Sequence, residues 1–147
     1  MKKIILGLGI AGILFAGYLS ATKLFAKTCV FGESCQNFLG YPACYFGFAM
    51  FLLITSLAGL MFLNKIKEER GFSYIAFVSM LGVFFAGYFT ILELPRLWAE
   101  GPSAYFFGLP TCTYGLIFFA LIFGLSTSKI FSLDEEEAKK TITQVDK

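Results

Sequence analysis

The sequence predicts an all-α polytopic membrane protein, a four-transmembrane-helix bundle built from two duplicated helical hairpins. Its 147 residues are 57% hydrophobic and only 15% charged, whereas soluble domains carry about 25% charged residues. Four apolar runs each approach the ~20 residues that a helix needs to cross a bilayer. Short sequence patterns also occur twice, once in each half of the chain. A soluble core could not absorb four such runs in so short a chain.

The first predicted span covers residues 4–22 and follows the pair Lys2 and Lys3. A lysine pair, an apolar stretch and small residues near Ala21 are also typical of a secretory signal. The segment has a counterpart later in the chain, however, which a discarded leader would not need. We therefore interpret residues 4–22 as a transmembrane helix.

The second and fourth predicted spans, 43–63 and 105–125, begin with the same pattern, G-x-P-x-C-x-x-G: LGYPACYFG and FGLPTCTYG. Proline is tolerated in the first helical turn, where its N–H has no helical partner, so Pro42 and Pro110 mark helix starts. Cys44 and Cys112 then lie about two residues into their helices. At that position unsatisfied N–H groups and the helix dipole favour a thiolate.

The third predicted span, 72–92, repeats the first. FAGYLS at 15–20 corresponds to FAGYFT at 85–90, an offset of 70 residues, and the two cysteine patterns are offset by 68. This spacing predicts two parallel copies of one unit, a span, a loop and a second span.

Segments next to the spans carry weaker signals. Lys23 and Glu93 occupy equivalent positions just beyond the first and third spans. An ion pair between them is one interpretation, and solvated span ends are the simpler expectation. In the loop at 95–104, Leu97 and Trp98 suggest a short segment at the membrane interface.

Positive charges predict the orientation, because cytoplasmic loops of membrane proteins are enriched in lysine and arginine. One side of the bundle would hold Lys2, Lys3, Lys65, Lys67, Arg70, Lys129, Lys139, Lys140 and Lys147, and the other only Lys23, Lys27 and Arg96. We therefore expect a multi-pass protein of the cell inner or plasma membrane, with a transmembrane domain at 1–128, a polar cytoplasmic tail at 129–147, and both termini in the cytoplasm. The net charge of +2 is spread over loop ends and indicates no nucleic-acid partner.

All four cysteines would then lie on the extracytoplasmic side. Cys29 and Cys35 fall in the first outer loop, and Cys44 and Cys112 at the outer ends of the second and fourth spans. Disulfides persist in that oxidising environment. The alternative is that these are ordinary buried cysteines, which pack as small apolar side chains.

The order of these features resembles the bacterial vitamin K epoxide reductase family. The matching elements are AGYLSATKLF, then Cys29, Cys35, GYP and Gly47, then AGYFTILEL and a proline–x–cysteine helix start, over most of residues 16–125. The resemblance implies a four-helix bundle around a quinone, a plan shared by the bacterial disulfide-forming quinone reductases. It also implies that an outer-loop cysteine pair takes electrons from a thioredoxin-like partner and passes them to a C-x-x-C pair at the last span.

Residue by residue, Cys29 and Cys35 match the loop pair and Cys112 matches the second cysteine of the C-x-x-C pair. Leu109 stands in place of the first, giving Leu-Pro-Thr-Cys. The repeat offers Cys44 as the missing partner, because helix starts at one depth of a bundle could meet the roughly 4.4–6.8 Å between Cα atoms that a disulfide requires. The expected catalytic residues are thus Cys29, Cys35, Cys44 and Cys112. Nearby aromatic residues would line a quinone site or form an interfacial belt: Tyr41, Tyr45, Phe46, Phe106, Phe107 and Tyr114.

The sequence therefore predicts a membrane thiol–disulfide oxidoreductase that exchanges electrons between an extracytoplasmic dithiol partner and a membrane quinone. The alternative is a non-catalytic membrane scaffold or accessory subunit held by structural disulfides. A metal or solute carrier fits less well. The chain has no histidine, its cysteine spacings are irregular, and the predicted spans lack the ionisable group that ion-coupled transport uses. We expect no metal.

Overall fold

The computed structural model describes residues 2–26, 37–38, 40–101 and 111–145. These form the helices α1 (Lys2–Ala26), α2 (Ala43–Phe62), α3 (Glu68–Glu100) and α4 (Thr111–Val145). Each helix is long and apolar enough to cross a membrane, which agrees with the four predicted spans. Ahead of α2, the short strands β1 (Asn37–Phe38) and β2 (Tyr41–Pro42) pair in antiparallel register.

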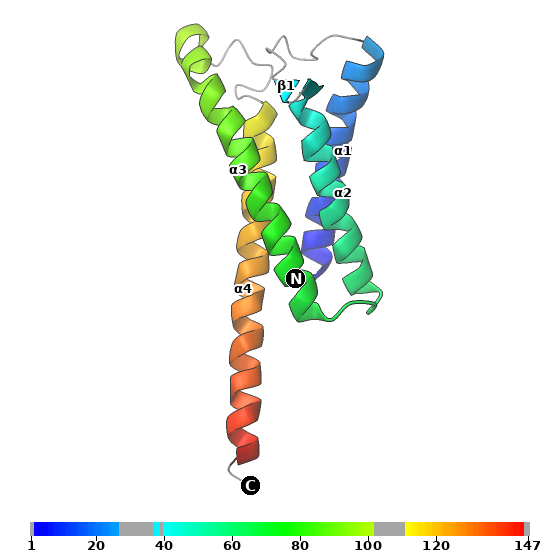
Figure 1. Ribbon diagram of the computed structural model, residues 1–147, viewed down its shortest axis with the longest axis vertical. Coiled ribbons are helices and arrows are strands. Elements are labelled where there is room, and N and C mark those ends of the chain that lie inside the picture. The colour runs from blue at the N-terminus through cyan, green and yellow to red at the C-terminus, as the bar shows by residue number, and fades with distance from the viewer. Residues whose placement is uncertain (1, 27–36, 39, 102–110, 146–147) are drawn as a thin grey trace.

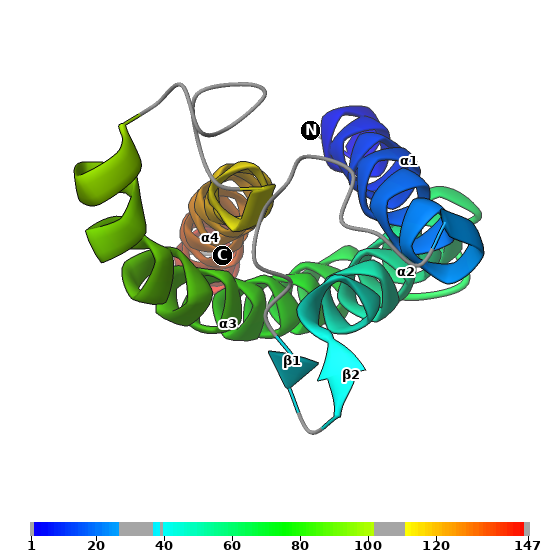
Figure 2. The same ribbon diagram turned by 90° about the horizontal axis from the view of Figure 1, so that it is seen from above.

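The helices pack as two antiparallel hairpins. α1 lies along α2, and α3 lies along α4 (Figure 1). The hairpins meet chiefly through α2 and α3, which are neighbours when the bundle is viewed from above (Figure 2). We call the end where α2 and α4 begin the cysteine end, and the end where α1 begins and α2 finishes the lysine end.

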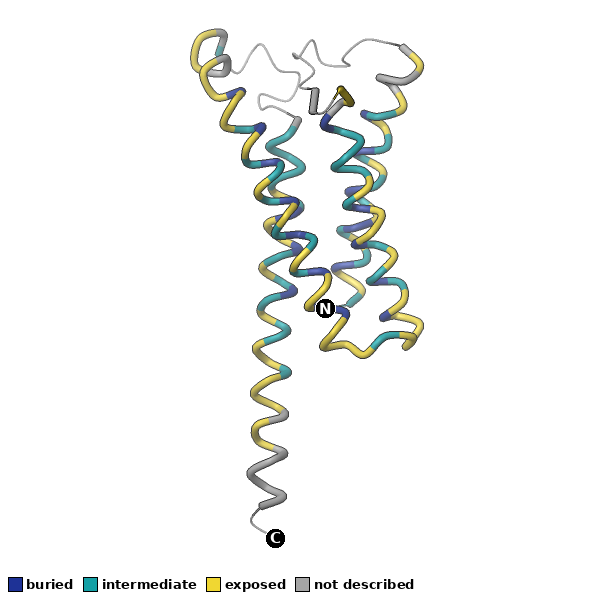
Figure 3. The backbone as a smooth tube through the Cα atoms, viewed as in Figure 1, coloured by how far each residue is buried: buried dark blue, intermediate teal, exposed yellow. Residues whose placement is uncertain are grey.

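The two hairpins bury equivalent positions. Each buried residue of α1 has a buried counterpart in α3 70 residues later, and three buried residues of α2 have counterparts in α4 68 residues later. Figure 3 shows buried positions recurring along the helices, separated by exposed ones. The pairs are Ile5/Ile75, Gly9/Ser79, Gly12/Gly82, Ala16/Ala86 and Leu19/Phe89, then Phe51/Phe119, Ile54/Ile122 and Ala58/Ser126. The repeated sequence patterns therefore correspond to repeated packing.

A pair of stacked rings joins the hairpins at the centre of the core. The rings of Phe51 and Phe119 lie 4.3 Å apart between centroids and are nearly parallel, at 9°. Gly12 faces the Phe51 ring, and Gly82 faces the Phe119 ring, so closely that a Cβ at either glycine would collide with it. The absence of side chains at these glycines allows α1 and α3 to approach the stack from opposite sides.

α3 is longer than the sequence indicates. It continues through Pro95 to Glu100, so residues 95–100 extend this helix instead of forming a separate interfacial segment. Proline has no N–H to donate to the carbonyl one turn earlier, which kinks a helix without always ending it. Figure 1 shows the last turns of α3 diverging from the other helices. The rest of the predicted loop segment, 102–104, lies outside the described residues.

α4 also continues past its apolar part. The helix runs to Val145, so most of the polar segment 129–147 is a helical extension of the fourth span. This extension projects beyond the lysine end of the bundle (Figure 1).

Candidate functional site

Cys44 and Cys112 occupy matching positions. α2 begins at Ala43 and α4 begins at Thr111, so each cysteine is the second residue of its helix, as the sequence predicts. Gly40 has a φ of 84° in the turn before α2, a conformation that glycine adopts without strain. Pro42 ends β2 directly before the helix. Both cysteines are half-buried and in the thiol form.

The two thiols line one cavity. It has a volume of about 60 Å³, and all four helices contribute to its walls. Apart from Ala43, every residue that lines it belongs to one of six equivalent pairs: Phe15/Phe85, Ala16/Ala86, Leu19/Phe89, Cys44/Cys112, Gly47/Gly115 and Phe51/Phe119. The cavity therefore lies where the two halves of the bundle meet, and two cysteines 68 residues apart in sequence share it.

Five of the thirteen residues that line the cavity are phenylalanines: Phe15, Phe51, Phe85, Phe89 and Phe119. The sequence carries a signal for four of them, because Phe15/Phe85 belong to the repeated FAGY pattern and Phe51/Phe119 to the repeat that begins with the cysteine pattern. Sequence reasoning missed them as site residues because apolar residues shared between two helices are also explained by packing alone.

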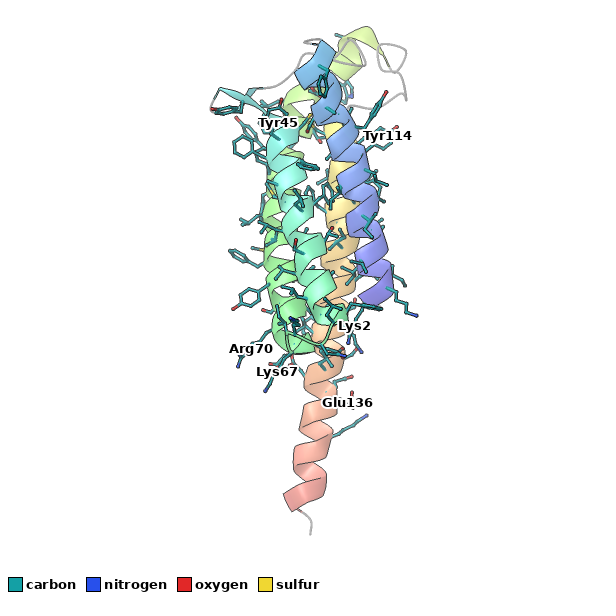
Figure 4. The ribbon with its side chains drawn as sticks, turned by 90° about the vertical axis from the view of Figure 1, so that its right-hand side faces the viewer. Lys2, Tyr45, Lys67, Arg70, Tyr114 and Glu136 are labelled. Carbon is teal, nitrogen blue, oxygen red and sulfur yellow. The ribbon has the colours of Figure 1, made fainter. Side chains whose placement is uncertain are left out.

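The aromatic residues expected around the cysteines take other places. Tyr41 on β2 is 63% exposed, and Tyr45 on α2 is half-buried. Phe46 and Tyr114 instead form a second layer, Phe46 against Phe85 at 5.8 Å and Tyr114 against Phe15 at 6.0 Å between ring centroids. Tyr45 and Tyr114 lie at the cysteine end (Figure 4). Of these four residues, none lines the cavity.

Other predicted site residues lie outside the described part of the chain. These are the loop cysteines Cys29 and Cys35 and the aromatic residues Phe106 and Phe107. Their roles stay predictions.

Glu93 lies inside the bundle, and the expectation of a solvated span end is wrong for this residue. Its exposed fraction is 4%, and α3 continues for two further turns beyond Leu92. Glu93 follows the cavity residues Ala86 and Phe89 at spacings of seven and four residues, which place the three on one face of α3. A carboxyl group is therefore buried one turn from the cavity wall, and ionisable groups at such positions are typically functional.

The cavity matches a quinone in chemistry but not in size. Its wall is apolar and aromatic, as in most small-molecule sites, yet such sites enclose roughly 300–1,000 Å³. A volume of about 60 Å³ does not enclose a quinone ring. Contact with a quinone would require side chains of the wall to move or the ring to stay at the rim.

Among the described residues, no group of three or more histidine, cysteine, aspartate or glutamate side chains is placed to hold a metal ion. No family model, no curated protein and no solved structure matches the chain. The features of the molecule that bear on function are therefore the cysteine pair, its cavity and the buried carboxyl of Glu93.

Proposed function

We propose that the chain is a membrane thiol–disulfide oxidoreductase in which Cys44 and Cys112 are the membrane-proximal redox pair. The observation that carries the proposal is their position, at equivalent helix starts and on one cavity. Two cysteines that cycle between dithiol and disulfide must be neighbours. The last span has Leu109 where a C-x-x-C pair would have its first cysteine. In this proposal, Cys44 takes the role of that missing cysteine.

The proposed reaction is an exchange between two cysteine pairs. A thioredoxin-like partner reduces the loop pair Cys29 and Cys35, and a thiolate of that pair attacks one sulfur of the Cys44–Cys112 disulfide. The second loop thiolate then breaks the mixed disulfide. The loop pair loses two electrons and becomes a disulfide, while Cys44 and Cys112 gain two electrons and two protons. A membrane quinone is the proposed acceptor: it would take up two electrons and two protons to become a quinol, while Cys44 and Cys112 return to the disulfide.

Glu93 has a proposed role in proton transfer. Reoxidation of Cys44 and Cys112 releases two protons, and only a thiolate attacks another sulfur or an acceptor. The buried carboxyl of Glu93, on the cavity face of α3, is suited to receive a proton from this pair. The apolar wall offers no other group of this kind.

The proposed placement follows the charges. The lysine end carries Lys2, Lys3, Lys65 and Lys67 and faces the cytoplasm in this account, because positive loops stay inside. Both termini are then cytoplasmic, and the cysteine end faces the oxidising side of the inner or plasma membrane.

Quinone reduction by a dithiol tests the proposal. The purified chain in lipid nanodiscs receives a soluble quinone and a dithiol reductant, and quinone absorbance is followed. Cys112→Ser and Cys44→Ser should each abolish the enzyme-dependent rate. Thr127→Ser, on the same helix as Cys112 and outside the cavity wall, should leave it unchanged. Undiminished turnover in a folded Cys112→Ser variant would reject the assignment.

The small size of the cavity favours one other candidate, a scaffold or accessory subunit in which Cys44 and Cys112 form a structural disulfide. The reduction potential of the pair separates the two. Structural disulfides have potentials below about −300 mV, and exchange-active pairs have higher values.

A further inference from the structure

A second cavity lies at the lysine end, away from the cysteines. Its volume is about 660 Å³, and all four helices or their connections reach it. Lys2 and Lys3 come from the start of α1, Glu68 from the start of α3, and Lys129 from the middle of α4. This volume falls within the roughly 300–1,000 Å³ of known small-molecule sites.

The cavity is positively charged. Three lysines face one glutamate, which leaves a net charge of +2. Glu68 is already engaged, because its carboxylate oxygen Oε1 lies 2.6 Å from Nζ of Lys2. The carboxylate of Glu68 therefore offsets the charge of Lys2, and the positive charges of Lys3 and Lys129 remain.

The turn after α2 adds a polar side chain to this cavity. Asn64 lines it and has a φ of 53°, in the left-handed region that asparagine tolerates better than most residues. Backbone hydrogen bonds from Asn64 to Met61 and from Lys65 to Leu60 hold the turn. The backbone of Asn64 is thus held by the turn, and its amide side chain lines the cavity together with the lysines.

Apolar side chains lie directly against the charged ones. Ile4 and Phe62 both line the cavity and are 55% and 51% exposed. They belong to α1 and α2, which are apolar enough to cross a membrane. A ligand that fits both parts carries an anionic headgroup and a hydrocarbon chain.

We propose that this lysine-end cavity binds the phosphate-bearing headgroup of an anionic phospholipid. Lys3 and Lys129 bind the phosphate, Asn64 donates a hydrogen bond to it, and the acyl chains continue along Ile4 and Phe62. Basic pockets between transmembrane helices are a known way of recognising such headgroups. The proposal does not depend on the redox chemistry at the other end of the bundle.

The alternative to a defined site is diffuse attraction between a basic surface and an anionic membrane. Diffuse attraction depends on the number of charges and little on their position. Lys65, Lys67 and Arg70 provide a matched control, because they lie near the same end of the chain's helices but do not line the cavity. Figure 4 shows Lys67, Arg70 and Lys2 at that end.

Native mass spectrometry of the full chain in detergent tests the proposal, with phosphatidylglycerol as the probe and phosphatidylcholine as the neutral lipid. Lys2→Gln/Lys3→Gln/Lys129→Gln should weaken phosphatidylglycerol binding at least about tenfold relative to the unaltered chain. Lys65→Gln/Lys67→Gln/Arg70→Gln removes the same charge and should weaken it less than about threefold, since diffuse attraction alone acts on these residues. Binding of phosphatidylcholine should be weak and equal in all forms.

A second variant guards against misfolding. Lys3→Gln/Lys129→Gln keeps the ion pair of Lys2 with Glu68 and should still show the selective loss. Equal losses in the cavity and control variants would overturn the proposal in favour of diffuse attraction. Displacement of phosphatidylglycerol by millimolar inorganic phosphate would also overturn it, because the site would then take a soluble anion.

Discussion

Cys44 and Cys112 each lie in the first turn of a helix, where backbone N–H groups have no carbonyl partner within the helix. In the proposed disulfide exchange, these groups would stabilise the negative charge that develops on sulfur. The surrounding wall is apolar and supplies no such stabilisation. The proposed chemistry of the cysteine pair therefore depends on the two helix starts and on Glu93. Among the described residues, Glu93 is the one buried carboxyl on the cavity face of a helix.

Glu93→Gln removes a proton acceptor while keeping the size and hydrogen-bonding capacity of the side chain. If Glu93 receives a proton during reoxidation of the pair, the quinone-reduction rate should fall by roughly 10², the lower range for general base catalysis. The pH dependence of the remaining rate should also change. Steady-state kinetics over a range of pH measures both effects.

The control for this substitution is Glu69→Gln, at the exposed start of the same helix, which should leave rate and pH profile unaltered. A Glu93→Gln variant with full activity would remove this residue from the proposed reaction. A loss of activity with a lowered melting temperature and an unchanged pH profile would reduce its role to folding.

At the scale of elements, close approach of the helices depends on two glycines. The Phe51 ring stacks on the Phe119 ring, and each ring is also closely approached by a glycine, Phe51 by Gly12 and Phe119 by Gly82. Both rings are almost fully buried, and packed cores accommodate added volume poorly. Each hairpin thus contributes one glycine and one ring to this packing, so the two hairpins depend on each other here.

Gly12→Ala and Gly82→Ala should each destabilise the bundle. The added methyl group meets a buried ring, and overpacking of this kind costs about 1–3 kcal/mol. Gly7→Ala and Gly87→Ala are matched controls in the same two helices, because an added Cβ meets nothing within 4 Å at Gly7 and only an ordinary contact at 3.8 Å at Gly87. Thermal or denaturant unfolding in detergent measures the difference. Equal stability of all four variants would contradict the account of the stack.

At the scale of the whole molecule, the chain is a repeated hairpin with a different cavity at each end. The cysteine cavity is small, apolar and lined by equivalent residues from both halves. The lysine-end cavity is larger and charged, and its lining includes Lys129 and Asn64, residues without identical counterparts in the other half. The repeat accounts for the first cavity, and divergence between the halves accounts for the second.

The sequence predicts the parts of this fold that depend on local and periodic signals. Long apolar runs set the four helices, and glycine and proline before Ala43 set the start of α2. The extension of α3 through Pro95 was not predictable in this way. A proline usually marks the end of a helix, and a local pattern does not show when the helix continues past it. The burial of Glu93 was likewise not predictable from a span that ends at Leu92. The phenylalanines that line the cysteine cavity come together only when the two halves of the chain pack, and no local sequence pattern indicates that packing.

Oxidative cross-linking of a chain that carries Cys29→Ser and Cys35→Ser tests the central claim most directly. With Cys44 and Cys112 as the remaining cysteines, a mild oxidant followed by peptide mass spectrometry should find one intramolecular disulfide between them. Its formation requires Cα atoms within about 4.4–6.8 Å. If both thiols instead stay available to an alkylating reagent, or bond only between separate chains, Cys44 and Cys112 are not a redox pair.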